Sequence, residues 1–373
     1  MKRILIALAV LLSVQVADAQ TKTPEAAKKA VESAEVAAAN PKKAAKLATW
    51  TKLASAYMDA YSAPAGAAWL GASKLMGNQK PISTENVVVA GDQLVKEVYA
   101  DKEFYYNVNG QLAIINVTKP VVEDALAKAA EAYKKAGELD VKGSKSKDIM
   151  AGLANVASKY SDDGMNCYQF GDLAKASQLF EKAVNVSAIA PLSKVDTTAL
   201  YNAAYTAWAG KDYERAKNFF EKCLDANYYY EGGEVFAKLG DVYTNLGDAK
   251  KGAETLEQGF VKFPQSQSIL IGLINYYMTS GENTDRLFSL IDEAKKNEPN
   301  NASLYYVEGN IYKELKNVEK AVESYYKCAE INPEYEFGYI GAGILYYDLA
   351  VELQDKAANE LDDAKWVALN EQF

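Results

Sequence analysis

The chain repeats an apolar stripe that has helical spacing. Four segments align without gaps: "GDLAKASQLFEKAV" from Gly171, "KDYERAKNFFEKCL" from Lys211, "GDAKKGAETLEQGF" from Gly247 and "KNVEKAVESYYKCA" from Lys316. Each begins with a turn-like pair and then places a small, a large and a small residue at i, i+4 and i+7, as in Ala321, Tyr325 and Cys328. This spacing predicts a helix with one apolar face, whose small residues let a neighbouring helix approach closely.

A further helix is predicted before each of these segments. Its mark is a small residue followed three positions later by a bulkier one, as in Gly309 and Tyr312. The small positions Gly240, Ile274, Gly309 and Gly343 are 34, 35 and 34 residues apart, and Pro264, Pro299 and Pro333 keep the same rhythm. Because glycine within a helix costs about 1 kcal/mol relative to alanine, its recurrence indicates a packing role.

Two helices in about 34 residues, with small residues at the crossing and a closing proline, resemble the tetratricopeptide repeat. The match is densest in "ASLYYVEGNIYKELKNVEKAVESYYKCAEINPEYE", residues 302–336. The resemblance implies an all-α fold, a right-handed α-solenoid of helix pairs. We expect tandem repeats within 147–373, at about 157–190, 197–230, 233–266, 267–301 and 302–335, with an incomplete unit at 336–373.

The segment "ATWTKLASAYMDAYSAPAG" predicts the first helix of an earlier repeat. Its stripe consists of Trp50, Leu53, Ala54 and Tyr57, and the matching second-helix residues come much later, at Ala129, Tyr133 and Ala136. We therefore expect one repeat-like unit over 47–142, interrupted by an insertion at 62–120 and preceded by an N-terminal helix within 20–46.

The insertion differs from its surroundings because its pattern is typical of β-strands from about 86 to 118. Asn109 and Gly110 stand between two runs of aromatic and β-branched residues, a strong hairpin signal, and two further β-type runs flank Gly91 and Asp92. We expect a small β-sheet or β-hairpin near the N-terminus. A long hairpin lying flat on the helices is the alternative, and the exposed edge of such an insertion would allow self-association.

The first nineteen residues have the three parts of a secretory signal peptide. Lys2 and Arg3 precede an apolar run, and small residues at Ala17 and Ala19 predict cleavage before Gln20. No later segment has the ~18 consecutive apolar residues of a membrane helix. We expect an exported protein of the periplasm, similar to the tetratricopeptide proteins that Bacteroidetes-type cells export.

Composition narrows the possible chemistry. The net charge of −9 becomes −11 when Lys2 and Arg3 leave with the signal peptide, which disfavours nucleic acid and anionic lipid as partners. The absence of histidine excludes Ser-His-Asp, Cys-His and HExxH sites. The three cysteines, Cys167, Cys223 and Cys328, are too widely spaced for a metal motif and are interpreted as packing residues. We predict no catalytic residue, cofactor or metal ligand, and no enzyme activity.

Aromatic and polar residues on the first helices of the repeats predict a binding surface. The resemblance implies that this side lines a concave groove, where such side chains suit a protein or peptide. The candidate groove residues are Tyr201, Tyr205, Trp208, Asn275, Tyr306, Asn310, Lys313, Ile340, Ile344 and Tyr347. The favoured hypothesis is a non-catalytic scaffold or adaptor. Two alternatives stay open: an envelope protein that stacks glycans on the Tyr/Trp stripe, and an enzyme using carboxylates or tyrosine where the insertion meets the helices.

Overall fold

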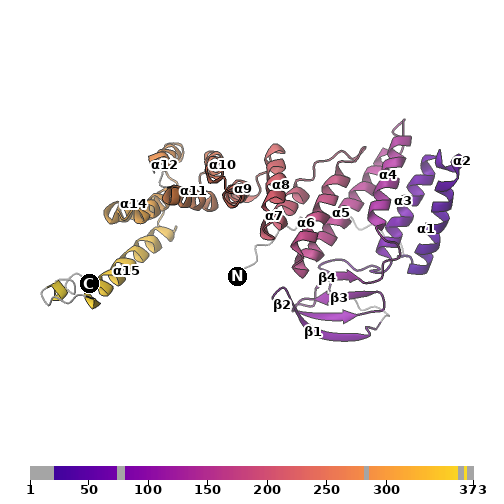
Figure 1. Ribbon diagram of the computed structural model, residues 1–373, viewed down its shortest axis with the longest axis horizontal. Helices are drawn as coiled ribbons and strands as arrows, with labels where there is room; N and C mark the ends of the chain where they lie inside the picture. Colours follow the sequence, from indigo (N-terminus) through magenta and orange to yellow (C-terminus); the bar gives the residue numbers. More distant parts are fainter. Residues whose placement is uncertain (1–20, 74–79, 281–284, 360–364, 368–373) are drawn as a thin grey trace. The chain divides into compact units, whose positions relative to one another are not determined.

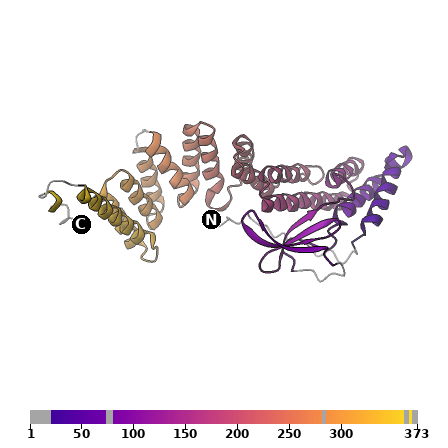
Figure 2. The same cartoon turned by 60° about the horizontal axis from the view of Figure 1, so that its bottom comes forward.

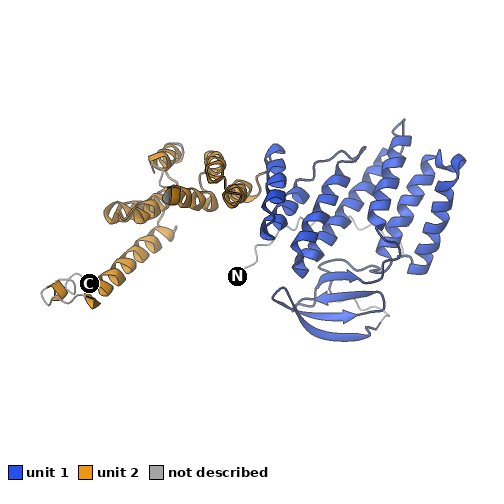
Figure 3. Ribbon diagram, viewed as in Figure 1, with its two compact units in different colours: residues 1–228 blue, residues 229–373 orange. Residues whose placement is uncertain are grey.

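Antiparallel helix pairs make up most of the chain, as the computed structural model in Figure 1 shows. The structure describes residues 21–73, 80–280, 285–359 and 365–367. The contacts divide the chain into unit 1, residues 1–228, and unit 2, residues 229–373 (Figure 3). Among the described residues, no helix combines the length and the apolarity needed to cross a membrane. The signal peptide predicted for residues 1–19 lies outside the described residues.

Unit 1 stacks helices that follow one another along the chain. They are α1 (Pro24–Ala39), α2 (Pro41–Ala44), α3 (Leu47–Ser62), α4 (Ala125–Leu139), α5 (Ser146–Phe170), α6 (Leu173–Ser187), α7 (Thr197–Ala209) and α8 (Tyr213–Asp225). Helix α1 buries Ala27, Val31 and Ala34 and exposes a charged face that includes Lys28 and Glu32. This end of the unit therefore presents a polar surface.

Helices α3 and α4 pack against each other although 62 residues of sequence separate their ends. Leu53 and Tyr57 of α3 share one apolar core with Ala129 and Tyr133 of α4. At the next contact, a Cβ built on Gly152 of α5 would lie 2.2 Å from the ring of Tyr133, so only glycine lets this ring lie against α5. The stripe of α3 is thus buried in the manner of a repeat first helix.

A four-stranded antiparallel sheet occupies the segment between α3 and α4. Its strands are β1 (Ser83–Val89), β2 (Asp92–Val98), β3 (Lys102–Tyr106) and β4 (Leu112–Val117), in the order β1-β2-β3-β4. The predicted sheet near the N-terminus is therefore confirmed. The Asn109-Gly110 turn joins β3 to β4, where the Oδ1 atom of Asn107 accepts hydrogen bonds from the N–H groups of Asn109 and Gln111. Between β1 and β2, Ala90 and Gly91 both have positive φ, as a two-residue hairpin turn requires.

The sheet lies alongside the helices of unit 1 and is attached mainly through α5 (Figure 2). The N–H of Ile115 donates to the Oδ1 atom of Asn166 at 3.0 Å, and the ring of Tyr105 meets that of Phe170 edge-on at 5.3 Å. Leu94 and Ile114 complete the apolar contact. A strand is thereby bonded to a helix side chain, which fixes the sheet on α5.

Unit 2 continues the helix pairs. Its elements are the 3₁₀ turn η1 (Glu231–Gly233) and α9 (Glu234–Asn245), α10 (Ala249–Lys262), α11 (Gln267–Ser280), α12 (Asp285–Asn297), α13 (Ala302–Glu314), α14 (Val318–Ile331) and α15 (Phe337–Ala358). A Cβ built on Gly240 would lie 2.7 Å from Leu256, and one on Gly309 would lie 2.6 Å from Tyr325. The recurring glycines therefore have a packing role that explains their helix-destabilising presence, since the large residue of the next helix lies directly against each of them.

The second helices of both units begin alike. The side chain of Asp172, Asp212, Asp248 or Asn317 accepts a hydrogen bond from the backbone N–H three residues later, at 3.1 to 3.2 Å. Each such cap stabilises its helix by about 1 kcal/mol. The turn-like pair in the four aligned segments is therefore an N-cap. Together, the helix pairs, their glycine crossings and the sheet confirm the predicted α-solenoid with a small β insertion.

Replacing Asn166 with alanine is expected to loosen the sheet while leaving the helices folded. The buried N–H of Ile115 would lose its acceptor, which costs about 1–3 kcal/mol. Hydrogen exchange of β4 should become faster in Asn166→Ala, while α7 and α8 keep their protection. Asn166→Asp retains an acceptor oxygen and serves as the control. Unchanged exchange in β4 of the alanine variant would show that this bond does not hold the sheet.

Candidate functional site

The three candidate groove residues of unit 1 form one aromatic cluster on α7. The rings of Tyr201 and Tyr205 stack at 6.1 Å, and that of Trp208 lies 5.6 Å from Tyr205. Tyr201 is only 3 % exposed and packs on Phe220 and Tyr228. Tyr201 therefore supports the helix packing, and Tyr205 and Trp208, both half-buried, are the members that face outward in part.

Three of the candidates in unit 2 have partners within the unit. Asn310 accepts a hydrogen bond from the hydroxyl of Tyr325 at 2.7 Å, and Lys313 pairs with Asp348 at 2.6 Å. Tyr306 packs its ring on Tyr325. These side chains link α13 to α14 and α15, so their availability to a partner would require breaking internal contacts.

The remaining four candidates are exposed. Asn275 lies on α11, and Ile340, Ile344 and Tyr347 lie on α15, with 44 %, 49 % and 69 % of their surface exposed. An isoleucine or tyrosine this exposed is unusual on three neighbouring positions of one helix. The face of α15 and Asn275 on α11 are thus the parts of the predicted surface that are most open to solvent.

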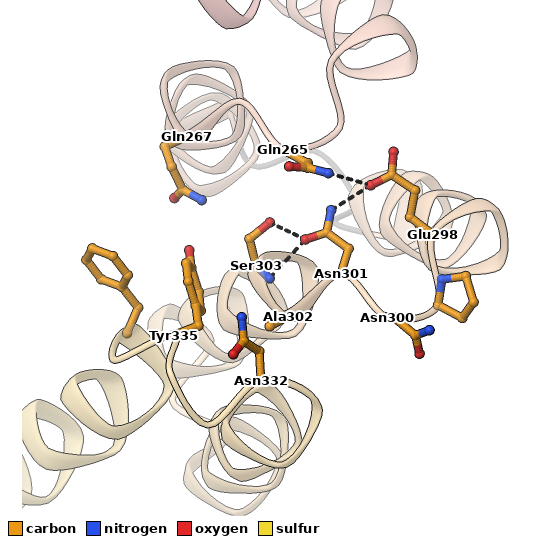
Figure 4. A pocket seen from close by; sticks show the side chains of 11 residues that line it. Gln265, Gln267, Glu298, Asn300, Asn301, Ala302, Ser303, Asn332 and Tyr335 are labelled. Carbon is orange, nitrogen blue, oxygen red and sulfur yellow. Dashed lines mark hydrogen bonds between the residues drawn. The ribbon is translucent and has the colours of Figure 1, made fainter.

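Sequence reasoning missed a polar hollow at the ends of three successive helix pairs in unit 2. This loop hollow has a volume of about 740 Å³. It lies where α10 meets α11, α12 meets α13 and α14 meets α15, and Figure 4 shows its side chains. The residues that line it are Gln265, Gln267, Glu298, Pro299, Asn300, Asn301, Ala302, Ser303, Asn332, Tyr335 and Phe337.

Hydrogen bonds fix the rear of the loop hollow. The carboxylate of Glu298 accepts from the side-chain amides of Gln265 and Asn301, at 2.9 and 2.8 Å (Figure 4). Asn301 in turn caps α13 by accepting from the N–H and hydroxyl of Ser303, at 3.1 and 2.7 Å. These bonds hold one wall of the hollow in place.

The open part of the loop hollow offers carboxamides beside aromatic rings. Gln267, Asn300 and Asn332 are exposed, and Phe337 is 42 % exposed with its ring 5.1 Å from that of Tyr335. Burial raises the pKa of Tyr335, so its hydroxyl stays protonated at neutral pH. The sequence signal was available, because carboxamides flank the proline of three successive joints in "PQSQ", "EPNNAS" and "INPEYEF".

Comparison with known proteins supports the repeat assignment. The sequence model of the tetratricopeptide repeat family matches residues 197–229 and 302–335. These ranges correspond to the pairs α7/α8 and α13/α14. The chain contains tetratricopeptide repeats.

A curated relative carries the same repeats. The chain is 24 % identical over 212 residues to a TPR repeat-containing protein of Methanocaldococcus jannaschii, covering 57 % of this chain and 30 % of that protein. The chain therefore spans less than a third of that relative.

Solved tetratricopeptide structures are also similar. One is the crystal structure of YrrB, described as a TPR protein with an unusual peptide-binding site, which is 24 % identical and has a TM-score of 0.32. The match covers 56 % of this chain and 97 % of YrrB. A tetratricopeptide repeat protein of Parabacteroides merdae is 15 % identical, with a TM-score of 0.30, 61 % and 91 % covered.

The junction between the sheet and the tetratricopeptide array holds acids that already have partners. Asp163 of α5 accepts a hydrogen bond from the hydroxyl of Tyr61 on α3 at 2.8 Å. On the sheet, Glu103 pairs with Lys96 at 2.9 Å and accepts from Tyr105 and Asn116. Within the described part of the chain, no group of three His, Cys, Asp or Glu side chains has metal-binding geometry.

The cysteines have the environment expected of packing residues. Cys223 and Cys328 are fully buried within second helices, and burial raises the pKa of Cys223 to about 12 and that of Cys328 to about 11. Cys167 on α5 is half-buried, and burial also raises its pKa. All three are therefore protonated at neutral pH, which disfavours a nucleophilic role.

Reaction with a thiol reagent at pH 8 is expected to separate the three cysteines. Cys167 should react first because it is partly accessible, whereas Cys223 and Cys328 should react only as the repeats open. The rate at which the reagent releases its coloured product is measured with native and with denatured protein. The fast phase is assigned to Cys167 if it disappears in Cys167→Ser. Rapid reaction of three thiols in native protein would contradict the burial of Cys223 and Cys328.

Asp163 is expected to make stability fall as pH rises through the acidic range. Burial raises its pKa from 3.8 to about 6, so the folded state binds this proton more tightly than the unfolded chain does. The contribution of protonated Asp163 to the free energy of unfolding is largest below about pH 4 and is lost by about pH 7. The free energy of unfolding of Asp163→Asn, measured relative to that of wild type, should therefore increase by on the order of 2 kcal/mol between pH 4 and pH 7. Urea unfolding at both pH values measures the difference.

Asp148→Asn is the matched control for this measurement, because Asp148 lies on the same helix, is exposed and pairs with Lys145 at 3.0 Å. Parallel pH profiles of wild type and Asp163→Asn would contradict the assignment.

Proposed function

We propose that the protein is a non-catalytic scaffold of the cell envelope that binds an extended peptide segment of another protein in the loop hollow. The observation that carries this proposal is a row of carboxamides from three repeat joints, with two aromatic rings beside them at the third joint. Each carboxamide offers a donor and an acceptor, as each peptide bond does, and the rings of Tyr335 and Phe337 supply apolar area.

The size and the frame of the loop hollow suit such a ligand. A volume of about 740 Å³ falls in the usual range of ligand sites, about 300–1,000 Å³. Glu298 is held by two amide donors, which leaves the exposed side chains of Gln267 and Asn332 to meet a bound chain. A preformed wall lowers the entropy lost on binding. The exposed groove residue Asn275 of unit 2 is proposed as an additional contact, and Tyr205 and Trp208 are proposed as a separate binding surface of unit 1.

The envelope location rests on the predicted signal peptide, with cleavage between Ala19 and Gln20. The acidic mature chain is consistent with a protein or peptide partner and disfavours nucleic acid.

Glycan binding is the second candidate, because carboxamides beside exposed rings also recognise sugar hydroxyls and sugar faces. Phe337 and Tyr335 would provide the stacking surface. Carboxylate catalysis at the sheet junction is less favoured, since Asp163 and Glu103 both accept hydrogen bonds from neighbouring side chains. The two candidates are distinguished by whether a peptide or an oligosaccharide shows saturable binding at the loop hollow.

Screening the purified mature protein against an array of 15-residue peptides and then titrating the selected peptides by calorimetry tests the proposal. Gln267→Ala should weaken binding about threefold to tenfold, the effect of losing one hydrogen-bonding group, and Tyr335→Ala should weaken it further. Gln258→Ala is the matched control, because Gln258 is exposed on α10 and does not line the hollow.

Peptides that bind all of these variants equally would contradict the proposed site. Saturable binding of oligosaccharides that Tyr335→Ala abolishes, without any selected peptide, would support the glycan alternative instead.

A further inference from the structure

One small residue of the array lacks the neighbour that its counterparts have. A Cβ built on Gly164, Gly240 or Gly309 would lie 2.6 to 2.9 Å from the large residue of the following helix, Phe180, Leu256 or Tyr325. Gly343 holds the same position on α15, yet a Cβ there would meet nothing within 4 Å. The crossing position at Gly343 is therefore unfilled, and we call the space over this glycine the socket.

The sequence after α15 does not supply the missing residue at the usual distance. In the α13/α14 pair the small, large and small residues follow Gly309 after 12, 16 and 19 positions, at Ala321, Tyr325 and Cys328. The same distances from Gly343 lead to Asp355, Asn359 and Asp362. Helix α15 instead continues through Ala358 without the turn that precedes a second helix. Among the described residues, nothing within 4 Å therefore fills the socket at Gly343.

The surface around the socket is a continuous apolar stripe. On the side of α15 opposite the buried residues Ala342 and Leu345, the exposed apolar side chains are Ile340, Ile344, Tyr347 and Val351, with Tyr339 and Tyr346 on the flank, each 37 % to 69 % exposed. A helix that is apolar around its whole circumference is normally buried on all sides. Exposed apolar side chains gathered on one face of a helix mark a contact surface.

Two acidic residues of α15 lie beside this stripe and have partners within the chain, whereas the exposed Asp355 follows Val351 by four positions at the end of the stripe. Asp348 pairs with Lys313 at 2.6 Å, and Glu352 pairs with Lys356 at 2.7 Å. A second apolar helix centred on residues 339–351 could therefore cover the stripe while Asp355 stays in water at its end, because burying an unpaired charge would be the main energetic obstacle to such a contact.

Helix α15 itself carries the pattern that fills such sockets. Gly343, Tyr347 and Ala350 have the small, large and small residues at i, i+4 and i+7 that the second helices use at Ala321, Tyr325 and Cys328. Tyr347 is 69 % exposed, so its ring projects from the surface beside the socket. The same face thus offers both the socket and the side chain that fits it.

We propose that the exposed face of α15 binds α15 of a second copy of this chain in an antiparallel, two-fold pair. The ring of Tyr347 from each copy would lie over Gly343 of the other. The same symmetry places Ile340 opposite Ala350, Tyr339 opposite Val351 and Ile344 opposite Tyr346, so apolar residues meet along the contact. Such a self-complementary contact closes as a dimer. This assigns Ile340, Ile344 and Tyr347 to self-association, apart from the peptide proposed for the loop hollow.

Sedimentation velocity of the full mature protein over a range of about 1 to 200 µM tests the pairing. Wild type is expected to shift from monomer to dimer within this range, as a small interface implies. Tyr347→Glu should raise the dissociation constant by about 30-fold or more, because it removes the central large residue and places a charge in the contact. Gly343→Leu should have a similar effect by filling the socket.

Two comparisons keep a folding defect from imitating the expected result. A Cβ at Gly343 meets no atom within 4 Å, so Gly343→Leu should leave the circular dichroism spectrum of the monomer unchanged and should not lower its thermal midpoint, because leucine favours a helix more than glycine does. The matched control is Val88→Glu, which adds the same charge at a 70 % exposed valine on β1. It should dimerise as wild type does.

A double variant sharpens the test. If Tyr347 occupies the partner's socket, Gly343→Leu combined with Tyr347→Ala should dimerise better than Gly343→Leu alone, because the smaller residue relieves the overlap. A monomer at 200 µM, or a wild-type dimer that Tyr347→Glu and Gly343→Leu leave intact, would overturn the proposal. Loss of the dimer in Val88→Glu alone would place the contact on the edge of the sheet.

Discussion

The packing of a large side chain over a small one, where two helices cross, is the constraint on which the array depends. Tyr325 lies against Gly309 and also against Gly341 of the following helix, with built Cβ distances of 2.6 and 2.5 Å. One ring therefore joins three helices, α13, α14 and α15. A residue larger than glycine at either position would push the ring out of both contacts. Stability in such an array is the sum of these local crossings.

The sheet shows how an insertion is accommodated without loss of this packing. It enters between α3 and α4, yet those helices meet as directly as helices joined by a short turn. The sheet is secured to the next helix instead, through Asn166, Phe170 and the apolar side chains above them. Because α5 carries the anchor, the α3/α4 pair needs no adjustment. The long α5 helix, 25 residues, provides the extra length for this contact.

Periodicity predicted the helices, their crossings and the hairpins because these depend on the residue and its near neighbours. Gly309 and the Asn109-Gly110 turn are examples, since a helical glycine opposite a tyrosine and a β-turn both leave local signals. The candidate surface was harder to predict. Tyr201 and Trp208 share a helix face in the sequence, but only the structure shows that Phe220 and Tyr228 bury Tyr201. The loop hollow is assembled from three joints, and its carboxamides also serve as turn and cap residues.

The two ends of the chain's helical series differ in what they present to water. Helix α1 shows charged side chains such as Lys28 and Glu32, whereas α15 shows tyrosine and isoleucine. A molecule with a self-associating surface at each end would form polymers, whereas a molecule with one self-complementary surface can bind only one other copy through it. In the two-fold pair proposed for α15, association through this face stops at two copies. A pair formed in this way would display two loop hollows on one particle, so a ligand with repeated binding segments would gain avidity without any stronger contact.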